Sequence, residues 1–161
     1  MRFISLTTAT VLTGLSESTL RRRIAEGLLL RTVEDGPKGR NMLALEALRP
    51  SLCFTLQNGD EQLILDADNG NSDSQCDLAL LLFEQDKQRA GVYWLELAAR
   101  QENLEAMHWL GRCYVEGNGL VRDENLGIMW LAKAAAKGHI LSKEMTAALV
   151  TDAAGGRGDV M

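Results

Sequence analysis

Residues 94–142 read WLELAARQENLEAMHWLGRCYVEGNGLVRDENLGIMWLAKAAAKGHILS, and this stretch decides the fold. It repeats after 36 residues, so that Trp94 aligns with Trp130 and WLELAARQENLEA aligns with WLAKAAAKGHILS. A second match runs backwards at an offset of 32 residues, where ADNGNSDS at 67–74 aligns with the residues that start at Ala99. Periods in this range are typical of arrays in which one helix hairpin stacks on the next. The sequence therefore predicts about two and a half such hairpins.

Several positions of the repeated unit have a clear physical role. Leu110 and Tyr114 are four residues apart and share one helix face, while Gly111 leaves space for a neighbouring helix to approach closely. The glycines of GNG at 117–119 permit the positive φ that ends a helix, and Asp123 is placed to cap the next one. The two offsets differ by four residues, and this difference falls in the turn between the paired helices, where a change of length is tolerated.

The pattern A-x-x-x-L-G-x-x-Y-x-x-G-x-G, followed by Asp, Trp and A-A-x-x-G, resembles the Sel-one-like repeat, a relative of the tetratricopeptide repeat. The resemblance spans roughly residues 61–142 and is strongest over 106–138. Proteins of this family are adaptors and scaffolds that bind other proteins on the concave face of a superhelix. We expect most aromatic side chains of the array to lie in its core. The candidate protein-binding residues, on the outward side of one predicted helix, are Trp109, Arg112 and Glu116.

Residues 1–50 have a different pattern and predict a separate module. Two short helices are expected, separated at Gly14. Thr7 or Thr8 is placed to cap the first helix, and Ser16 is placed to cap the second. Two β-leaning arms then flank a hairpin turn, DGPKG, and a short third helix stops at a proline. The second helix turns Leu20 and Ile24 to one side and leaves hydroxyls and arginines on the other.

This first module resembles the winged helix-turn-helix of MerR-type regulators and phage excisionases. Their Thr-Leu-Arg step and their Gly-Leu-Leu motif are present at 19–21 and 27–29. Those families bind DNA through the second helix and the wing, and arginines and hydroxyls suit phosphates and guanine edges. The resemblance implies DNA contacts from Ser18, Thr19, Arg21, Arg22, Lys38 and Arg40.

Charge divides the chain in the same way as the two patterns. Residues 1–49 carry eight Lys or Arg against five Asp or Glu, whereas residues 50–161 carry nine against seventeen. A basic head joined to an acidic body suggests that the two parts meet different partners. The predicted fold is mainly α, with a small winged helix-turn-helix (three helices and a β-hairpin wing) followed by α-α superhelical hairpins. The expected divisions are 1–50 for the head, 51–60 for a connector, 61–150 for the repeats and 151–161 for a disordered tail.

Other features of the sequence argue against several classes of protein. It has no run of 18 apolar residues and no apolar leader, which predicts a cytoplasmic, bacterial protein that does not enter a membrane. The three cysteines, Cys53, Cys76 and Cys113, are widely spaced and are expected to be buried thiols. His108 and His139 are expected to be partly exposed residues at helix ends. No metal-ligand or nucleophile pattern is present, so we expect neither a cofactor nor an enzyme.

Two functional hypotheses follow. In the first, the head binds double-stranded DNA while the array binds a protein partner, which would couple a regulatory signal to transcription. In the second, the head does not bind DNA, and the chain is an interaction adaptor or scaffold for proteins alone. Two and a half repeats also leave an open end, which either the head covers or a second copy shares. We expect a homodimer.

Overall fold

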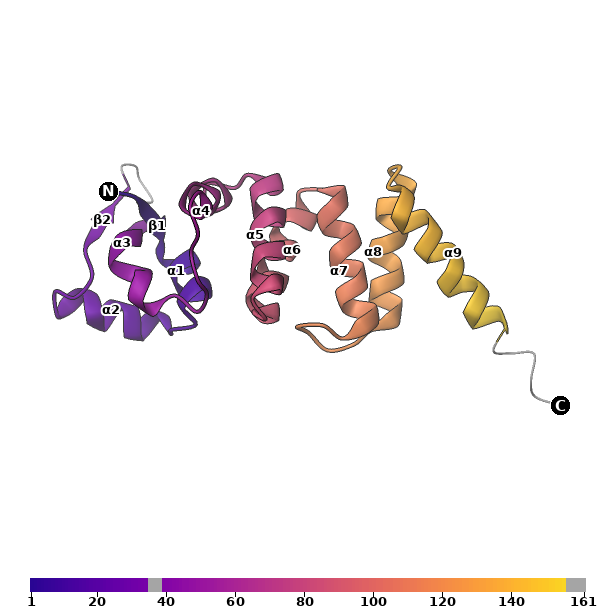
Figure 1. Ribbon diagram of the computed structural model, residues 1–161, viewed down its shortest axis with the longest axis horizontal. Helices are drawn as coiled ribbons and strands as arrows, with labels where there is room; N and C mark the ends of the chain where they lie inside the picture. The colour runs from indigo at the N-terminus through magenta and orange to yellow at the C-terminus, as the bar shows by residue number, and fades with distance from the viewer. Residues whose placement is uncertain (35–38, 156–161) are drawn as a thin grey trace.

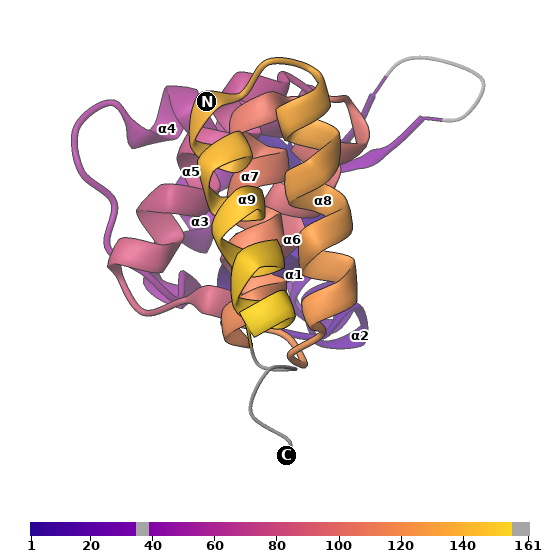
Figure 2. The ribbon, with the colours of Figure 1, turned by 90° about the vertical axis from the view of Figure 1, so that its right-hand side faces the viewer.

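The computed structural model describes residues 1–34 and 39–155, and Lys38 lies outside them. The chain forms an elongated molecule in which a small head is followed by a row of helices, and α9 lies at the far end (Figure 1). Seen along the row from α9, the helices of the array lie one behind another (Figure 2). None of the described helices is both long enough and apolar enough to cross a membrane.

The head combines three short strands with short helices. The strands form one antiparallel sheet in the order β1-β3-β2, in which Ile4 pairs with Leu43 and Thr32 pairs with Met42. The expected hairpin arms correspond to β2 and β3, whereas β1 is too short to give a periodic signal in the sequence. In chain order the elements are β1 (Phe3–Ser5), α1 (Leu6–Thr13), α2 (Glu17–Ala25), β2 (Arg31–Val33), β3 (Asn41–Ala44), α3 (Leu45–Leu48) and the 3₁₀ turn η1 (Arg49–Ser51).

The caps of the two head helices agree with the sequence at one position and differ at the other. Ser16 caps α2 as predicted, and its Oγ accepts the Thr19 N–H at 3.2 Å. The prediction that Thr7 or Thr8 caps the first helix is wrong. Ser5 is the cap, because it ends β1 in an extended conformation and its Oγ accepts the Thr8 N–H at 3.2 Å. A strand therefore leads directly into α1.

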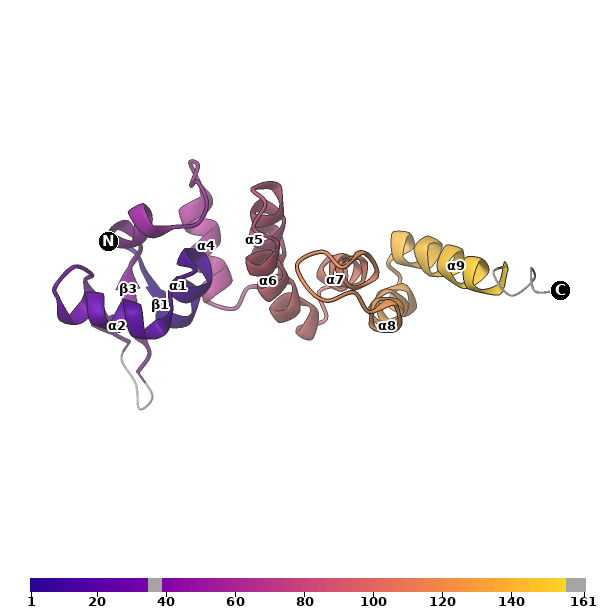
Figure 3. The ribbon, with the colours of Figure 1, turned by 90° about the horizontal axis from the view of Figure 1, so that it is seen from below.

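The array is a series of antiparallel helix hairpins. A single helix, α4, precedes two full hairpins, and α9 follows them (Figure 3). Asn71, Asn103 and Asp123 each accept a backbone N–H with the side chain and so begin a helix. The predicted cap at Asp123 is confirmed. The bounds are α4 (Asp60–Asp68), α5 (Ser72–Glu84), α6 (Gln88–Arg100), α7 (Leu104–Glu116), α8 (Glu124–Ala136) and α9 (Ile140–Gly155).

Glycines set the distance between the two helices of the second hairpin. A Cβ atom added at Gly111 would lie 3.0 Å from the Gly127 carbonyl oxygen and 2.7 Å from Cγ of Leu131. A Cβ atom added at Gly127 would lie 2.8 Å from the Gly111 carbonyl oxygen. The two backbones therefore touch, as the sequence predicts for Gly111. Gly117 and Gly119 have φ values of 71° and 78°, which confirms their place in the turn.

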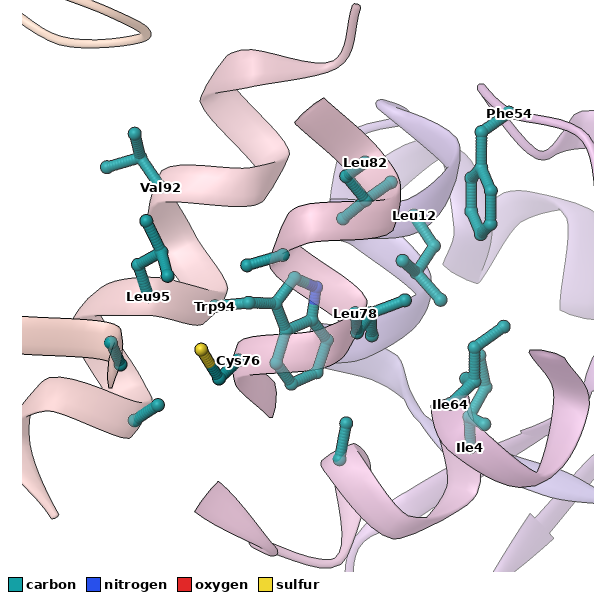
Figure 4. Close-up of a cluster of buried hydrophobic side chains, with 14 of the residues drawn as sticks. Ile4, Leu12, Phe54, Ile64, Cys76, Leu78, Leu82, Val92, Trp94 and Leu95 are labelled. Carbon is teal, nitrogen blue, oxygen red and sulfur yellow. The ribbon is translucent and has the colours of Figure 1, made fainter. Parts of the chain in front are cut away.

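One hydrophobic core runs from the head into the array. Leu12 of α1, Leu78 of α5 and Trp94 of α6 belong to the same cluster, in which Ile4 of the sheet and Ile64 of α4 also take part (Figure 4). Trp94 is 1% exposed and is a core residue, as expected for most aromatics of the array. The head therefore covers the first end of the row of helices, which is one of the two arrangements left open by the sequence.

Polar contacts reinforce the junction between head and array. Asp68, at the end of α4, accepts the Ser5 N–H at 2.9 Å and the hydroxyls of Ser5 and Thr8. Glu61 of α4 pairs with Arg2 and Arg49 of the head. The segment between η1 and α4 is packed too, since Phe54 is only 8% exposed. A junction with buried carboxylate contacts holds the two parts in one orientation.

The last helix extends further than the sequence suggested. We expected the repeats to end at about residue 150, but α9 continues to Gly155. The added residues include Ala153 and Ala154, which favour helix. Ser142 is its one buried residue, while Ile140 and Val150 are 70% and 56% exposed. The rest of the predicted tail, 156–161, lies outside the described residues.

Candidate functional site

The first candidate surface is the outer side of α2. Ser18, Arg21 and Arg22 are exposed on it, and Thr19 is half-buried with its hydroxyl 2.9 Å from Ser16 Oγ. Each arginine lies beside a carboxylate of the same helix. Arg21 Nε donates to Glu17 at 2.8 Å, and Arg22 Nε lies 3.9 Å from Glu26. The structure brings these predicted residues together but partly balances their charge.

A groove of about 330 Å³ separates α2 from the strands beside it. Arg21 lies on its helical side, while Arg31 of β2 and Asn41 of β3 lie on the other. Neither Arg31 nor Asn41 was predicted to bind DNA. The sequence marks them only as residues at the start of the two predicted hairpin arms.

Arg40 does not belong to that groove. It lies at a second, polar cleft, whose lining includes Thr7 of α1 and Asp68 of α4. Arg40 Nε donates to Glu34 at 2.7 Å, and this guanidinium lowers the pKa of the Glu34 carboxyl. Lys38 is not among the described residues. Of the six residues implied for DNA contact, the four on α2 therefore form one surface, and Arg40 lies apart from them.

The second candidate surface is a groove of about 330 Å³ between α5 and α7. All three predicted protein-binding residues line it. The indole N–H of Trp109 donates to Glu105 at 2.8 Å, and the Arg112 guanidinium lies 4.9 Å from the centre of the Trp109 ring. Arg112 also donates to Glu116 at 3.0 Å. These contacts hold the indole and the guanidinium in place along one wall of the groove.

Helix α5 supplies the opposite wall with Leu80, Phe83 and Glu84. Cys113 lies at the base of the groove, where burial raises the pKa of its thiol to about 11. Cys76 and Cys113 are buried free thiols as predicted, whereas Cys53 is only partly buried. The groove thus has an apolar base, an aromatic edge and a charged rim.

The structure also assembles a polar cluster that sequence reasoning missed. His108 is 4% exposed, so the expectation that it is partly exposed is wrong. Its Nδ1 lies 2.9 Å from Ser142 Oγ, and that oxygen lies 2.9 Å from His139 Nδ1. His139 Nε2 then contacts Glu105 at 3.0 Å. The cluster joins residues that are 34 positions apart, which a linear pattern does not reveal.

In this cluster a serine hydroxyl contacts a histidine, and the same histidine contacts a carboxylate. Ser142 is 0% exposed, and no substrate can reach its hydroxyl in this arrangement. His139 Nδ1 also accepts the Ser142 N–H at 3.2 Å, as the cap of a helix does. We therefore assign the cluster to the attachment of α9 to α7. Within residues 1–34 and 39–155, no three His, Cys, Asp or Glu side chains are arranged to hold a metal ion.

Comparisons with known proteins identify the array. A family model described as the Sel1 repeat matches residues 72–103 and 104–139, which cover α5 with α6 and α7 with α8. A solved structure, a Sel1 repeat protein from Oxalobacter formigenes, is 31% identical with a TM-score of 0.53, over 56% of this chain and 73% of that chain. A search of curated proteins finds no match.

These findings confirm the resemblance of the array to Sel1 repeats over residues 72–139. The matched segments begin at residue 72, so the resemblance of the head to winged helix-turn-helix domains stays a prediction. Sel1 repeats generally mediate contacts between proteins, which agrees with the apolar groove between α5 and α7. With two matched repeats and a similar solved structure covered over most of its length, the chain belongs to the Sel1 repeat family.

Proposed function

We propose that the chain is an adaptor whose groove between α5 and α7 binds a segment of another protein. The observation that carries this proposal is the groove itself, in which the apolar side chains of Leu80 and Phe83 on one wall face the half-buried indole of Trp109 on the other. Half-buried aromatic side chains beside arginine are typical anchors of protein interfaces. Helices on both walls keep the groove open before a partner arrives, which reduces the entropy lost on binding.

Selection from a displayed random peptide library tests this proposal. Peptides that bind the full chain are collected and then measured against a Trp109→Ala variant and a Trp130→Ala variant. Trp130 is also half-buried, but it lies in a different cleft, between α6 and α8. We expect binding to fall by about tenfold or more for Trp109→Ala, as for an interface anchor. Peptides that lose equal affinity with both variants would contradict the proposal.

The head carries a second candidate function, which is binding of duplex DNA as part of a transcription regulator. The observation that favours it is the exposed side of α2, where Ser18, Arg21 and Arg22 lie and where Arg21 lines a groove together with Arg31 of β2. Small hydroxyl residues allow close approach to a duplex, and arginines bind phosphates or guanine. The adjoining strands would then contact the flanking backbone.

A titration of labelled duplex DNA against salt separates this function from a head that binds only proteins. Contacts with phosphates release counterions, so the affinity is expected to fall steeply as salt rises. Arg22→Ala is expected to weaken binding, whereas Arg122→Ala serves as the control. Arg122 is an exposed arginine beside a glutamate, as Arg22 is, but it lies in the array. No binding at low salt would favour the protein-only adaptor.

Association of two copies is a separate proposal. It is supported by α9, where Ile140, Leu141 and Val150 are 70%, 57% and 56% exposed at the end of the row that the head does not cover. Burial of such side chains is favourable, and a pair of copies would double the contacts with DNA. Light scattering at micromolar concentration checks it, and the mass of one chain would refute it.

A further inference from the structure

The two helices that form the groove present their side chains in register. Along α5 the residues Asp73, Asp77, Leu80 and Glu84 have spacings of four, three and four, which place them on one helix face. The same spacings occur 32 residues later in α7, at Glu105, Trp109, Arg112 and Glu116. The groove therefore lies between two parallel rows with equivalent positions. Each row begins and ends with an acidic residue.

These two rows carry more acidic than basic side chains. Besides His108, the only basic side chain on α5 and α7 is Arg112, and it already donates to Glu116. Glu84 lines the groove, and Asp77 lies about one helical turn before Leu80 on the same face of α5. Both are exposed, and among the described residues neither forms an ion pair. A negative rim attracts basic groups and repels acidic ones.

The apolar base lies within this acidic rim. Leu80 falls between Asp77 and Glu84 in the sequence of α5, and Trp109 lies on the other wall. The two acidic positions are seven residues apart along the helix, which corresponds to roughly 10 Å along the axis. An extended chain covers that distance in about three to four residues, and side chains four positions apart lie on the same face. One apolar side chain between two basic ones would meet all of these groups at once.

We propose that the segment bound in the groove is an extended peptide in which an apolar side chain is flanked, two positions away on each side, by Lys or Arg, so that all three side chains lie on one face of the chain. This inference rests on the proposed function, because it names the partner chemistry of the same groove. The apolar side chain packs on Leu80 and Trp109, and the basic side chains reach Asp77 and Glu84. A partner with acidic flanks is repelled from the same surface.

Two peptides that differ only in their flanks test the proposal. One contains Lys-Ala-Leu-Ala-Lys and the other contains Glu-Ala-Leu-Ala-Glu, and each is titrated into the full chain by fluorescence anisotropy. We expect the lysine peptide to bind at least tenfold more tightly at low salt, with a smaller difference at high salt, because exposed charges are screened. Equal binding of the two peptides would overturn the inference.

Two double variants show whether the acidic side chains of α5 cause the preference for the lysine peptide. Asp77→Asn with Glu84→Gln is expected to weaken the lysine peptide about fivefold, the sum of two exposed ion pairs. The control, Glu144→Gln with Asp152→Asn, removes two exposed acidic groups from α9 and should leave the affinity unchanged. An equal loss in both double variants would mean that net charge, and not the groove, attracts the peptide, and would overturn the inference.

The random library separates failure of this inference from failure of the proposed function. Peptides that depend on Trp109 and are enriched in Lys or Arg support both. Peptides that depend on Trp109 without such enrichment contradict the partner chemistry and leave the adaptor function standing. A library that contains no peptide dependent on Trp109 contradicts both.

Discussion

The two candidate surfaces differ in how they treat charge. On the head, Arg21, Arg22 and Arg40 each lie beside a glutamate of their own element or hairpin. In the array, Glu84 of the groove and Asp77, on the same face of α5, have no such partner among the described residues. Binding at the head would therefore have to compete with carboxylates that are already in place. The groove exposes apolar surface, so an apolar side chain that binds there does not have to displace a carboxylate.

The two regions are nevertheless parts of one body. Asp68 of α4 bonds to the cap residue of α1, and Arg2 and Arg49 of the head pair with Glu61. Bonds from a carboxylate to a backbone N–H and hydroxyls are stronger than bonds between neutral groups. A ligand on one region therefore meets the other region in a fixed orientation. Substitutions can therefore break the contacts between the two regions or change the charge balance of one of them.

The largest effect is expected from Asp68→Ala, which breaks the junction. The change removes the acceptor of the Ser5 N–H and of the Ser5 and Thr8 hydroxyls. A loss of about 3 kcal/mol in the free energy of unfolding is expected, since buried donors lose a charged partner. Urea denaturation measures it. Asp66→Ala is the control, because among residues 1–34 and 39–155 the Asp66 side chain accepts a hydrogen bond only from Gln62 of its own helix. Equal losses would show that the junction is not specific.

A second change acts on the array alone. Gly127→Ala puts a methyl group 2.6 Å from Cγ2 of Val115 and 2.8 Å from the Gly111 carbonyl oxygen. We expect a loss of about 2 kcal/mol, as for overpacking of a core. Gly111→Ala should cost less, because the added Cβ atom there lies 3.0 Å from the nearest carbonyl oxygen instead of 2.8 Å, and the first hairpin carries Ala79 at the equivalent position. Thermal unfolding ranks the two variants, and the reverse order would contradict this account.

A third change removes the charge balance of the head. Glu17→Gln with Glu26→Gln deletes the carboxylates beside Arg21 and Arg22. If the arginines bind phosphate, duplex affinity should rise about fivefold, since each exposed pair is worth less than about 1 kcal/mol. Anisotropy of labelled DNA measures it. The control, Glu124→Gln, removes the carboxylate beside Arg122 in the array. No gain over the control would argue against DNA binding by α2.

The smallest effect concerns pH and the attachment of α9. Burial, and then the nearby His139, lower the pKa of His108 below its usual value of 6.5. The unfolded chain therefore takes up a proton at His108 before the folded chain does, and stability falls as the pH drops below about 6.5. Glu105 acts in another range, because its pKa is lowered and its contribution is lost only below about 4.5.

Unfolding measured at pH 7.5 and at pH 5.5 tests this difference. His108→Asn keeps an acceptor or donor near the Nδ1 position that contacts Ser142 but has no charge to gain. The variant should therefore lose part of the difference between the two pH values. A variant with the same pH dependence as the natural chain would exclude His108 as its source.

Much of the array could be predicted from the sequence because its signals are local and repeat. Gly111, Gly117 and Asp123 each have the role that their residue type predicts. The cap of α1 was misplaced because Ser5 also ends a strand, and β1 becomes a strand only when β3 pairs with it. The side chains selected for protein binding do meet in one groove. Its other wall, on α5, depends on the packing of two repeats.

The order of residues alone is sufficient to predict the helix hairpins, their period, and the division into a basic head and an acidic array. The helices follow from residue type and spacing within a few turns, and the period and the charge division follow from comparing longer stretches of the chain. Only the tertiary structure decided that Asp68 joins the head to the array and that Glu105, His139 and Ser142 meet. It also decided which charges are balanced, because an ion pair depends on distance in space between groups that packing brings together.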